Sequence, residues 1–169
     1  MGAGKTTLGR ALAKRLGLQF YDLDWYIENR FQQKIPDIFA QKGEGYFREL
    51  EQRMLHEVGE FEDIVLACGG GTPCFFDNMD YLNRQGETVY LCARPEVLKA
   101  HLLMGKGVRP LIQGKSPEEL EAYIATSLAG REAHYLKAKH KVELDVIHTD
   151  ADIDRYIEEI RRKINQKNA

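Results

Sequence analysis

The sequence is poor in cysteine and contains no long apolar run. Three cysteines occur among 169 residues, and none forms a C-x-x-C pair with another. A sparse, odd set is typical of reduced thiols and predicts neither a disulfide framework nor a zinc site. No apolar stretch approaches the length that crosses a bilayer, and no segment resembles a signal peptide. We therefore expect a cytoplasmic protein without a membrane partner.

The sequence also lacks an excess of either charge. Lys and Arg number 24, Asp and Glu number 26, and the formal net charge is -2. Without a basic stripe or an aromatic platform, a nucleic-acid partner is not expected. The five histidines show neither triad nor metal-ligand spacing, and we interpret them as structural. With 43% hydrophobic and 30% charged residues, the composition is that of an ordinary globular domain.

Hydrophobic periodicity predicts strands that alternate with helices along the chain. The expected strands are residues 19–21, 64–68, 88–92 and 142–147, and the expected helices include residues 6–16, 36–41, 47–58 and 152–164. Such alternation is typical of an α/β protein, with a parallel sheet flanked by helices. We expect one domain over residues 1–169.

A glycine-rich segment at the start of the numbering matches the end of the phosphate-binding pattern G-x-x-x-x-G-K-[ST]. It stands before a predicted helix, where backbone N–H groups and the helix dipole together hold an anion. Lys5 is expected to reach the β- and γ-phosphates of ATP, and the Thr6 hydroxyl to ligate Mg²⁺ as the cofactor. The predicted ATP-binding residues are Gly2, Ala3, Gly4, Lys5, Thr6 and Thr7.

Of three further motifs, the first two each allow two interpretations. Asp22 and Asp24, at a strand end, are either a metal-facing and an acceptor-facing pair or solvated acids that cap the next helix. The glycines at 69–71 either let a ligand lie against bare backbone or form a flexible turn. Arg48 and Glu51 have the spacing of a surface ion pair on a helix.

Two arginines lie farther along the chain. Arg109 falls in a glycine-bounded stretch and is expected to close over ATP and neutralise charge in the transition state. Residues 116–119, Ser-Pro-Glu-Glu, form a capping box that begins a helix. Arg131 lies late in that helix, where a cation is common.

Taken in order, these motifs resemble those of the shikimate kinase family. The matching segments are GAGKTT at 2–7, DLD at 22–24, FRELE at 47–51, GGG at 69–71, VRPL at 108–111, and the arginine at 131 four residues before a tyrosine. The resemblance extends from the first residue to about the last strand. It implies a three-layer P-loop kinase fold, like that of nucleoside monophosphate kinases, with a lid at about 105–116. The implied activity is ATP-dependent phosphorylation of shikimate to shikimate 3-phosphate, in chorismate and aromatic amino acid biosynthesis.

The resemblance also implies roles for individual residues. Asp24 would engage the attacking hydroxyl, and two arginines would hold the shikimate carboxylate, which a guanidinium matches bidentately. Asp22 would lie near Mg²⁺ through water, and Arg109 would be the lid residue over ATP. The implied catalytic residues are Lys5, Asp24 and Arg109, and the implied shikimate-binding residues are Asp24, Arg48, Gly70, Gly71 and Arg131. The expected partners are ATP and shikimate, bound by a monomer.

The family's first strand would lie between the strands predicted at 64–68 and 88–92, and the chain as numbered lacks it. We therefore expect the start of the protein to lie upstream, with Met1 an internal methionine of the phosphate loop. Two alternatives stay open: another small P-loop kinase, such as one acting on gluconate, and a nucleotide-binding fragment without turnover. Turnover with shikimate against gluconate would separate the two kinases.

Overall fold

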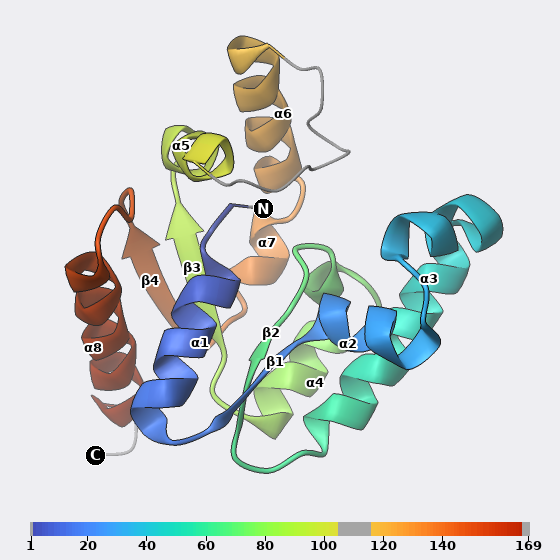
Figure 1. The fold of residues 1–169 in the computed structure, drawn as a ribbon, viewed down its shortest axis with the longest axis horizontal. Coiled ribbons are helices and arrows are strands. Elements are labelled where there is room, and N and C mark those ends of the chain that lie inside the picture. Colours follow the sequence, from blue (N-terminus) through green and yellow to red (C-terminus); the bar gives the residue numbers. More distant parts are fainter. Residues whose placement is uncertain (1, 105–115, 167–169) are drawn as a thin grey trace. The chain divides into compact units, whose positions relative to one another are not determined.

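The computed structural model describes residues 2–104 and 116–166 and divides into two compact units (Figure 1). We call Lys5–Thr88 the N-terminal unit, and Met1–Gly4 together with Val89–Ala169 the C-terminal unit. Both units combine helices with parallel strands, as the predicted α/β class requires. The predicted lid at about 105–116 lies outside the described residues except for Ser116.

The N-terminal unit is built on two parallel strands, β1 (Gln19–Asp22) and β2 (Ile64–Ala67). Asp22 pairs with Ala67 at their carboxyl ends, so the segments that follow both strands leave the same edge. Helix α1 (Lys5–Leu16) packs against both strands. The remaining elements of the unit are α2 (Leu23–Phe31), α3 (Ile35–Gly59), the 3₁₀ turn η1 (Thr72–Cys74) and α4 (Asn78–Gln85).

Helix α1 follows the predicted apolar pattern over most of its length. Leu8 and Leu12 are buried, as expected, whereas Leu16 at the last position is 40% exposed. Gly17 then takes a φ of 72°, and the Leu18 N–H donates to the Ala13 carbonyl at 2.9 Å. This left-handed glycine cap ends the helix where the sequence predicted.

Helix α3 is bent at Gly43, whose φ of 78° and ψ of 173° are not helical. The two helices predicted at 36–41 and 47–58 are therefore present as the two arms of one bent element. Apolar side chains from both arms and from α2 form the core of the unit, namely Leu23, Ile27, Ile38, Phe47, Leu50, Met54 and Leu55. The packing fixes the face of α3 that carries Arg48 and Glu51.

The C-terminal unit holds a second parallel pair, β3 (Val89–Ala93) and β4 (His140–Leu144). Strand β4 begins two residues before, and ends three residues before, the predicted strand at 142–147. Helix α5 packs against α6, and α8 packs against β4 through Tyr156, Ile157 and Ile160. The helices of this unit are α5 (Pro95–Met104), α6 (Pro117–Ala129), α7 (Glu132–Tyr135) and α8 (Asp150–Gln166).

The strands of the described residues form two separate parallel pairs rather than one continuous sheet. Three short elements, η1, α4 and α7, had no counterpart among the predictions. Within residues 2–104 and 116–166, no helix is both long and apolar enough to cross a bilayer.

The predicted capping box is present at the start of α6. The Ser116 hydroxyl accepts from the Glu119 N–H at 3.2 Å, and the Glu119 carboxylate accepts from the Ser116 N–H at 2.7 Å. We expect Ser116→Ala to lower the free energy of unfolding by about 1 kcal/mol, because it leaves a helix N–H without its acceptor. Urea denaturation checks this, with Ser127→Ala inside the same helix as the control. Equal stability of both variants would contradict the prediction.

Candidate active site

Asp22 joins the phosphate-binding segment to the end of β1. Its carboxylate accepts from the Thr6 hydroxyl at 2.9 Å through Oδ2 and from the Asp24 N–H at 3.2 Å through Oδ1. The second bond caps α2, so the helix-capping part of the sequence interpretation holds for Asp22, but both aspartates are partly buried rather than solvated. The first bond places a carboxylate beside the hydroxyl predicted to bind Mg²⁺.

Asp24 lies within the first turn of α2, in a cluster of acidic groups. The pKa of its carboxyl is raised from 3.8 to about 6, mainly by burial and in addition by the negative charges of Asp22 and Glu51. The Lys5 ammonium acts in the opposite direction. A carboxyl with a pKa near 6 is largely ionised at pH 7 and is a stronger base than an ordinary aspartate.

Glu51 links α3 to the turn that follows β2. It is 1% exposed, and its carboxylate accepts from Arg48 Nη1 at 2.8 Å and from the Thr72 hydroxyl at 2.7 Å. The interpretation of Arg48 and Glu51 as a surface pair is therefore wrong. Burial makes this pair a fixed part of the site, because an unpaired buried carboxylate is strongly unfavourable.

The Arg48 side chain is 11% exposed, and its guanidinium carbon lies 4.2 Å from the centre of the Phe75 ring. Its other edge donates from Nε and Nη2 to Glu44 Oε1, at 3.2 and 3.1 Å. The Glu44 side chain is 59% exposed. Arg48 thus has one permanent carboxylate partner inside the protein and a second at the surface.

The glycine segment after β2 forms a hydrogen-bonded turn. The Thr72 N–H donates to the Gly69 carbonyl at 3.2 Å, and the Cys74 N–H donates to the Gly71 carbonyl at 2.8 Å. A Cβ on Gly71 would lie 2.7 Å from Arg48 Nη1, and one on Gly69 would lie 3.0 Å from Asp24 Oδ1. The missing side chains therefore leave room for the two functional groups.

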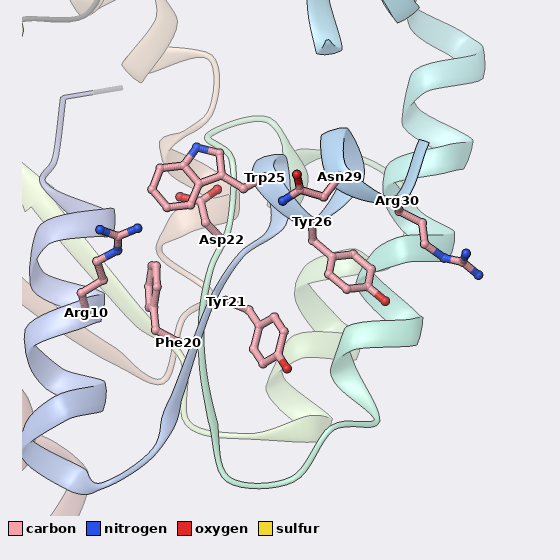
Figure 2. Close-up of a pocket in the computed structure, with 8 residues that line it drawn as sticks. All are labelled: Arg10, Phe20, Tyr21, Asp22, Trp25, Tyr26, Asn29 and Arg30. Carbon is pink, nitrogen blue, oxygen red and sulfur yellow. The ribbon is translucent and has the colours of Figure 1, made fainter. Parts of the chain in front are cut away.

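A pocket of about 420 Å³ opens beside β1, and Figure 2 shows its eight lining residues. The Arg10 guanidinium carbon lies 4.7 Å from the Trp25 ring centre and 5.6 Å from that of Phe20. The pocket shares Asp22 with the acidic cluster. Its lining residues are Arg10, Phe20, Tyr21, Asp22, Trp25, Tyr26, Asn29 and Arg30.

The structure brings together, in the N-terminal unit, most of the predicted site residues. The Thr6 hydroxyl donates a hydrogen bond to Asp22, and the positive charge of Lys5 lowers the pKa of Asp24. Arg48 approaches Gly71, while Gly70 accepts from the Cys74 thiol at 3.8 Å, and Thr7 is exposed.

The other predicted residues either belong to the C-terminal unit or lie outside the described residues. Gly2, Ala3 and Gly4 belong to the C-terminal unit. So does Arg131, which follows α6 as the N-cap residue of α7 rather than lying inside α6. Arg109 lies outside the described residues.

Sequence reasoning missed Thr72, Phe75 and Asn78 as supports of the site. The Asn78 amide is fully buried and donates to the Thr72 carbonyl at 2.9 Å, which ties α4 to η1. These residues lie in a segment without hydrophobic periodicity, so no pattern marked them. Glu51 was visible in the FRELE segment, but its burial was not.

Comparison with known proteins gives one consistent family. The sequence profile of the shikimate kinase family matches residues 1–163. The shikimate kinase of Phocaeicola vulgatus is 49% identical over 98% of this chain and 95% of its own. The crystal structure of shikimate kinase from Bacteroides thetaiotaomicron superposes with a TM-score of 0.93, at 45% identity over 96% of this chain and 92% of that one. Shikimate kinase from Acinetobacter baumannii in complex with shikimate gives a TM-score of 0.84, at 34% identity over 99% and 89% of the two chains.

The raised pKa of Asp24 predicts a pH-dependent loss of stability. The folded protein binds the Asp24 proton more tightly than the unfolded chain, so this group stabilises fully below pH 3.8, and the contribution is lost as pH rises through about 6. The cost at pH 7 is about 3 kcal/mol. Asp24→Asn removes it, so we expect the variant to gain stability over the natural protein at pH 7 but not at pH 4. Urea denaturation of both proteins, without nucleotide or metal, measures this, and a difference that is the same at both pH values would contradict it.

Proposed function

The chain belongs to the shikimate kinase family, and we propose that it transfers the γ-phosphate of ATP to shikimate with Asp24, Arg48 and the phosphate loop as the main working groups. The product is shikimate 3-phosphate. The family match to residues 1–163 supports a single kinase domain over the chain, and the motif at 108–111 implies a lid near 105–116. The observation that carries the residue assignment is the arrangement of Asp24 and Arg48 around the turn after β2.

Arg48 is suited to hold the substrate carboxylate. Glu51 fixes the guanidinium from the buried side, so the edge with Nε and Nη2 keeps one orientation. That edge already binds a carboxylate, because both nitrogens donate hydrogen bonds to Glu44 Oε1. Since Glu44 is an exposed side chain, a ligand carboxylate can displace it at little cost. We propose Arg131 as the second arginine, as the family motif implies.

Asp24 is suited to receive the proton of the attacking hydroxyl. The hydroxyl oxygen forms a bond to the γ-phosphorus, the bond from that phosphorus to the bridging oxygen breaks, and ADP leaves with its electron pair. The hydroxyl proton passes to Asp24, whose pKa of about 6 leaves it ionised and ready at pH 7. Alignment and charge neutralisation supply most of the rate, because the transition state of phosphoryl transfer is loose.

The remaining assignments follow the motif. Lys5 would bind the β- and γ-phosphates, and Arg109 would close over ATP from the lid. Thr6 and Asp22 present hard oxygen donors 2.9 Å apart, which fit Mg²⁺, with Asp22 acting through water. The described residues contain no cluster of three metal-ligating side chains, and Mg²⁺ needs none, because phosphates and water complete its shell. Bound Mg²⁺ would neutralise phosphate charge. The bare backbone of Gly70 and Gly71 would lie against shikimate.

Acceptor-dependent release of ADP tests this function. We expect the chain to release ADP from MgATP with shikimate and not with gluconate, since gluconate presents no ring to the glycine turn. Asp24→Asn should lower kcat by roughly 100- to 10,000-fold, because it removes the proton acceptor. The exposed Asp37→Asn, on α3, is the matched control. Turnover of gluconate, or full activity of Asp24→Asn, would contradict the proposal.

The carboxylate assignment predicts opposite effects of two substitutions on the KM for shikimate. Arg48→Lys should raise it roughly 10- to 100-fold, because an ammonium cannot make the forked contact. Glu44→Gln should lower it roughly two- to fivefold, because the competing surface carboxylate is gone. Steady-state kinetics at saturating ATP measures both, with the exposed Glu49→Gln as the control. A higher KM in Glu44→Gln would show that Glu44 is not a competitor.

A further inference from the structure

His101, on α5, makes a hydrogen bond from each ring nitrogen to a different backbone segment of the C-terminal unit. Its Nδ1 lies 2.8 Å from the Gly2 carbonyl oxygen, and its Nε2 lies 2.8 Å from the Ile147 nitrogen. The Ile147 N–H can only donate, so Nε2 must accept and carries no proton. Nδ1 therefore carries the proton and donates to Gly2. The two contacts define one neutral tautomer.

The Ile147 side of this bridge is firmly held. Ile147 lies between β4 and α8, and the residues around it bond to α8. The Asp145 N–H donates to the Tyr156 hydroxyl at 2.7 Å, and the Thr149 N–H donates to the Asp152 carboxylate at 3.0 Å. His101 is thus tied to a fixed connection at one end and to the glycine-rich loop at the other.

Gly2 docks closely on the helix that carries His101. Its φ is 72°, and an added Cβ would lie 2.9 Å from the Leu98 carbonyl oxygen and 3.1 Å from Leu102 Cγ. This packing places the Gly2 carbonyl within reach of the imidazole. The bond to His101 then fixes the rotation of the Gly2–Ala3 peptide plane.

Fixing the Gly2–Ala3 peptide plane also fixes the direction of the Ala3 N–H. In a trans peptide the carbonyl oxygen and the following N–H point in opposite directions from one rigid plane. Because His101 draws the Gly2 carbonyl toward α5, the Ala3 N–H points away from α5. A phosphate loop works by aiming such N–H groups at an anion, and Ala3 lies in the middle of the motif.

We propose that His101 is a positioning residue that orients the phosphate loop for the polyphosphate of a nucleoside triphosphate. The donation from Nδ1 to Gly2 carries this role, and the acceptance at Nε2 holds the ring in the tautomer that can donate. The inference rests on the proposed ATP-dependent function.

Two amide variants separate the donor from the acceptor. The amide of His101→Asn branches from Cγ, as Nδ1 does, so it can still donate to Gly2. The amide of His101→Gln lies one bond farther out, near Nε2, so it can serve Ile147 but not Gly2. We expect His101→Gln, and also His101→Ala, which removes both contacts, to raise the KM for ATP and the Kd for MgADP about three- to tenfold. His101→Asn should keep both constants near the values of the natural protein. The KM for shikimate should not change in any of them.

The controls separate positioning from folding. Leu103→Gln, 65% exposed on the same helix, should leave every constant unchanged. Thermal denaturation shows whether a variant is merely less stable, and ¹⁵N NMR of the imidazole in the natural protein shows which nitrogen carries the proton. A protonated Nε2, equal Kd values for Asn and Gln, or a joint rise of both KM values that follows Tm would overturn the proposal.

The same measurements keep this inference apart from the proposed function. Suppose that the Kd values for MgADP of the natural chain and its His101 variants fall in the expected order, but the natural chain does not turn over shikimate. The phosphoacceptor assignment then fails and the role of His101 stands. If the natural chain turns over shikimate and the Asn and Gln variants bind MgADP equally, the role of His101 fails and the proposed function stands.

Discussion

The buried carboxylate of Glu51 is the constraint on which the N-terminal unit depends. A charge at 1% exposure is tolerable only with close partners, and its partners are Arg48 on the same helix and Thr72 in the turn after β2. Asn78 extends the same network into α4 through the Thr72 carbonyl. One charged group therefore joins three elements that are distant in sequence. Neither Arg48 nor the turn can move without leaving that charge unsatisfied.

This constraint also sets the chemistry of the neighbouring acid. Burial and the charge of Asp22 raise the pKa of Asp24, and Glu51 adds to this effect, while Lys5 lowers that pKa and Arg48 pairs with Glu51. The site therefore holds more acid than its immediate cations neutralise, which is unfavourable for the empty protein. The charge balance of the site changes only during turnover, when a metal-bound polyphosphate and a cyclic acid bind and a proton leaves. Stability and function oppose each other at Asp24, as is common where a pKa is tuned for proton transfer.

Periodic features were predictable from the sequence, and the supports of the site were not. The strand ends that deliver Asp22 and Gly69, the two helical segments on either side of Gly43 and the capping box at Ser116 all follow from local patterns, and the structure contains them. The buried Glu51 is bonded by the Thr72 hydroxyl, and no local pattern records a contact between α3 and a turn 21 residues later. For the same reason His101 looked like one of five unremarkable histidines. Its role depends on Gly2 and Ile147, which are 99 and 46 residues away.

The two glycine-rich segments look alike in sequence but have different physical reasons for lacking side chains. Gly71 has an ordinary φ of -84°, so a larger residue would meet no backbone strain there, and what excludes it is the Arg48 guanidinium. Gly2 has a φ of 72° and also lies against α5, so both conformation and space exclude a side chain. In each case a neighbouring helix occupies the space where a side chain would lie, and that helix brings a nitrogen donor to the loop. The donor is Arg48 beside Gly71 and His101 beside Gly2. In these loops glycine matters less for its flexibility than because the missing side chain lets a rigid helix approach closely and hold the backbone in place.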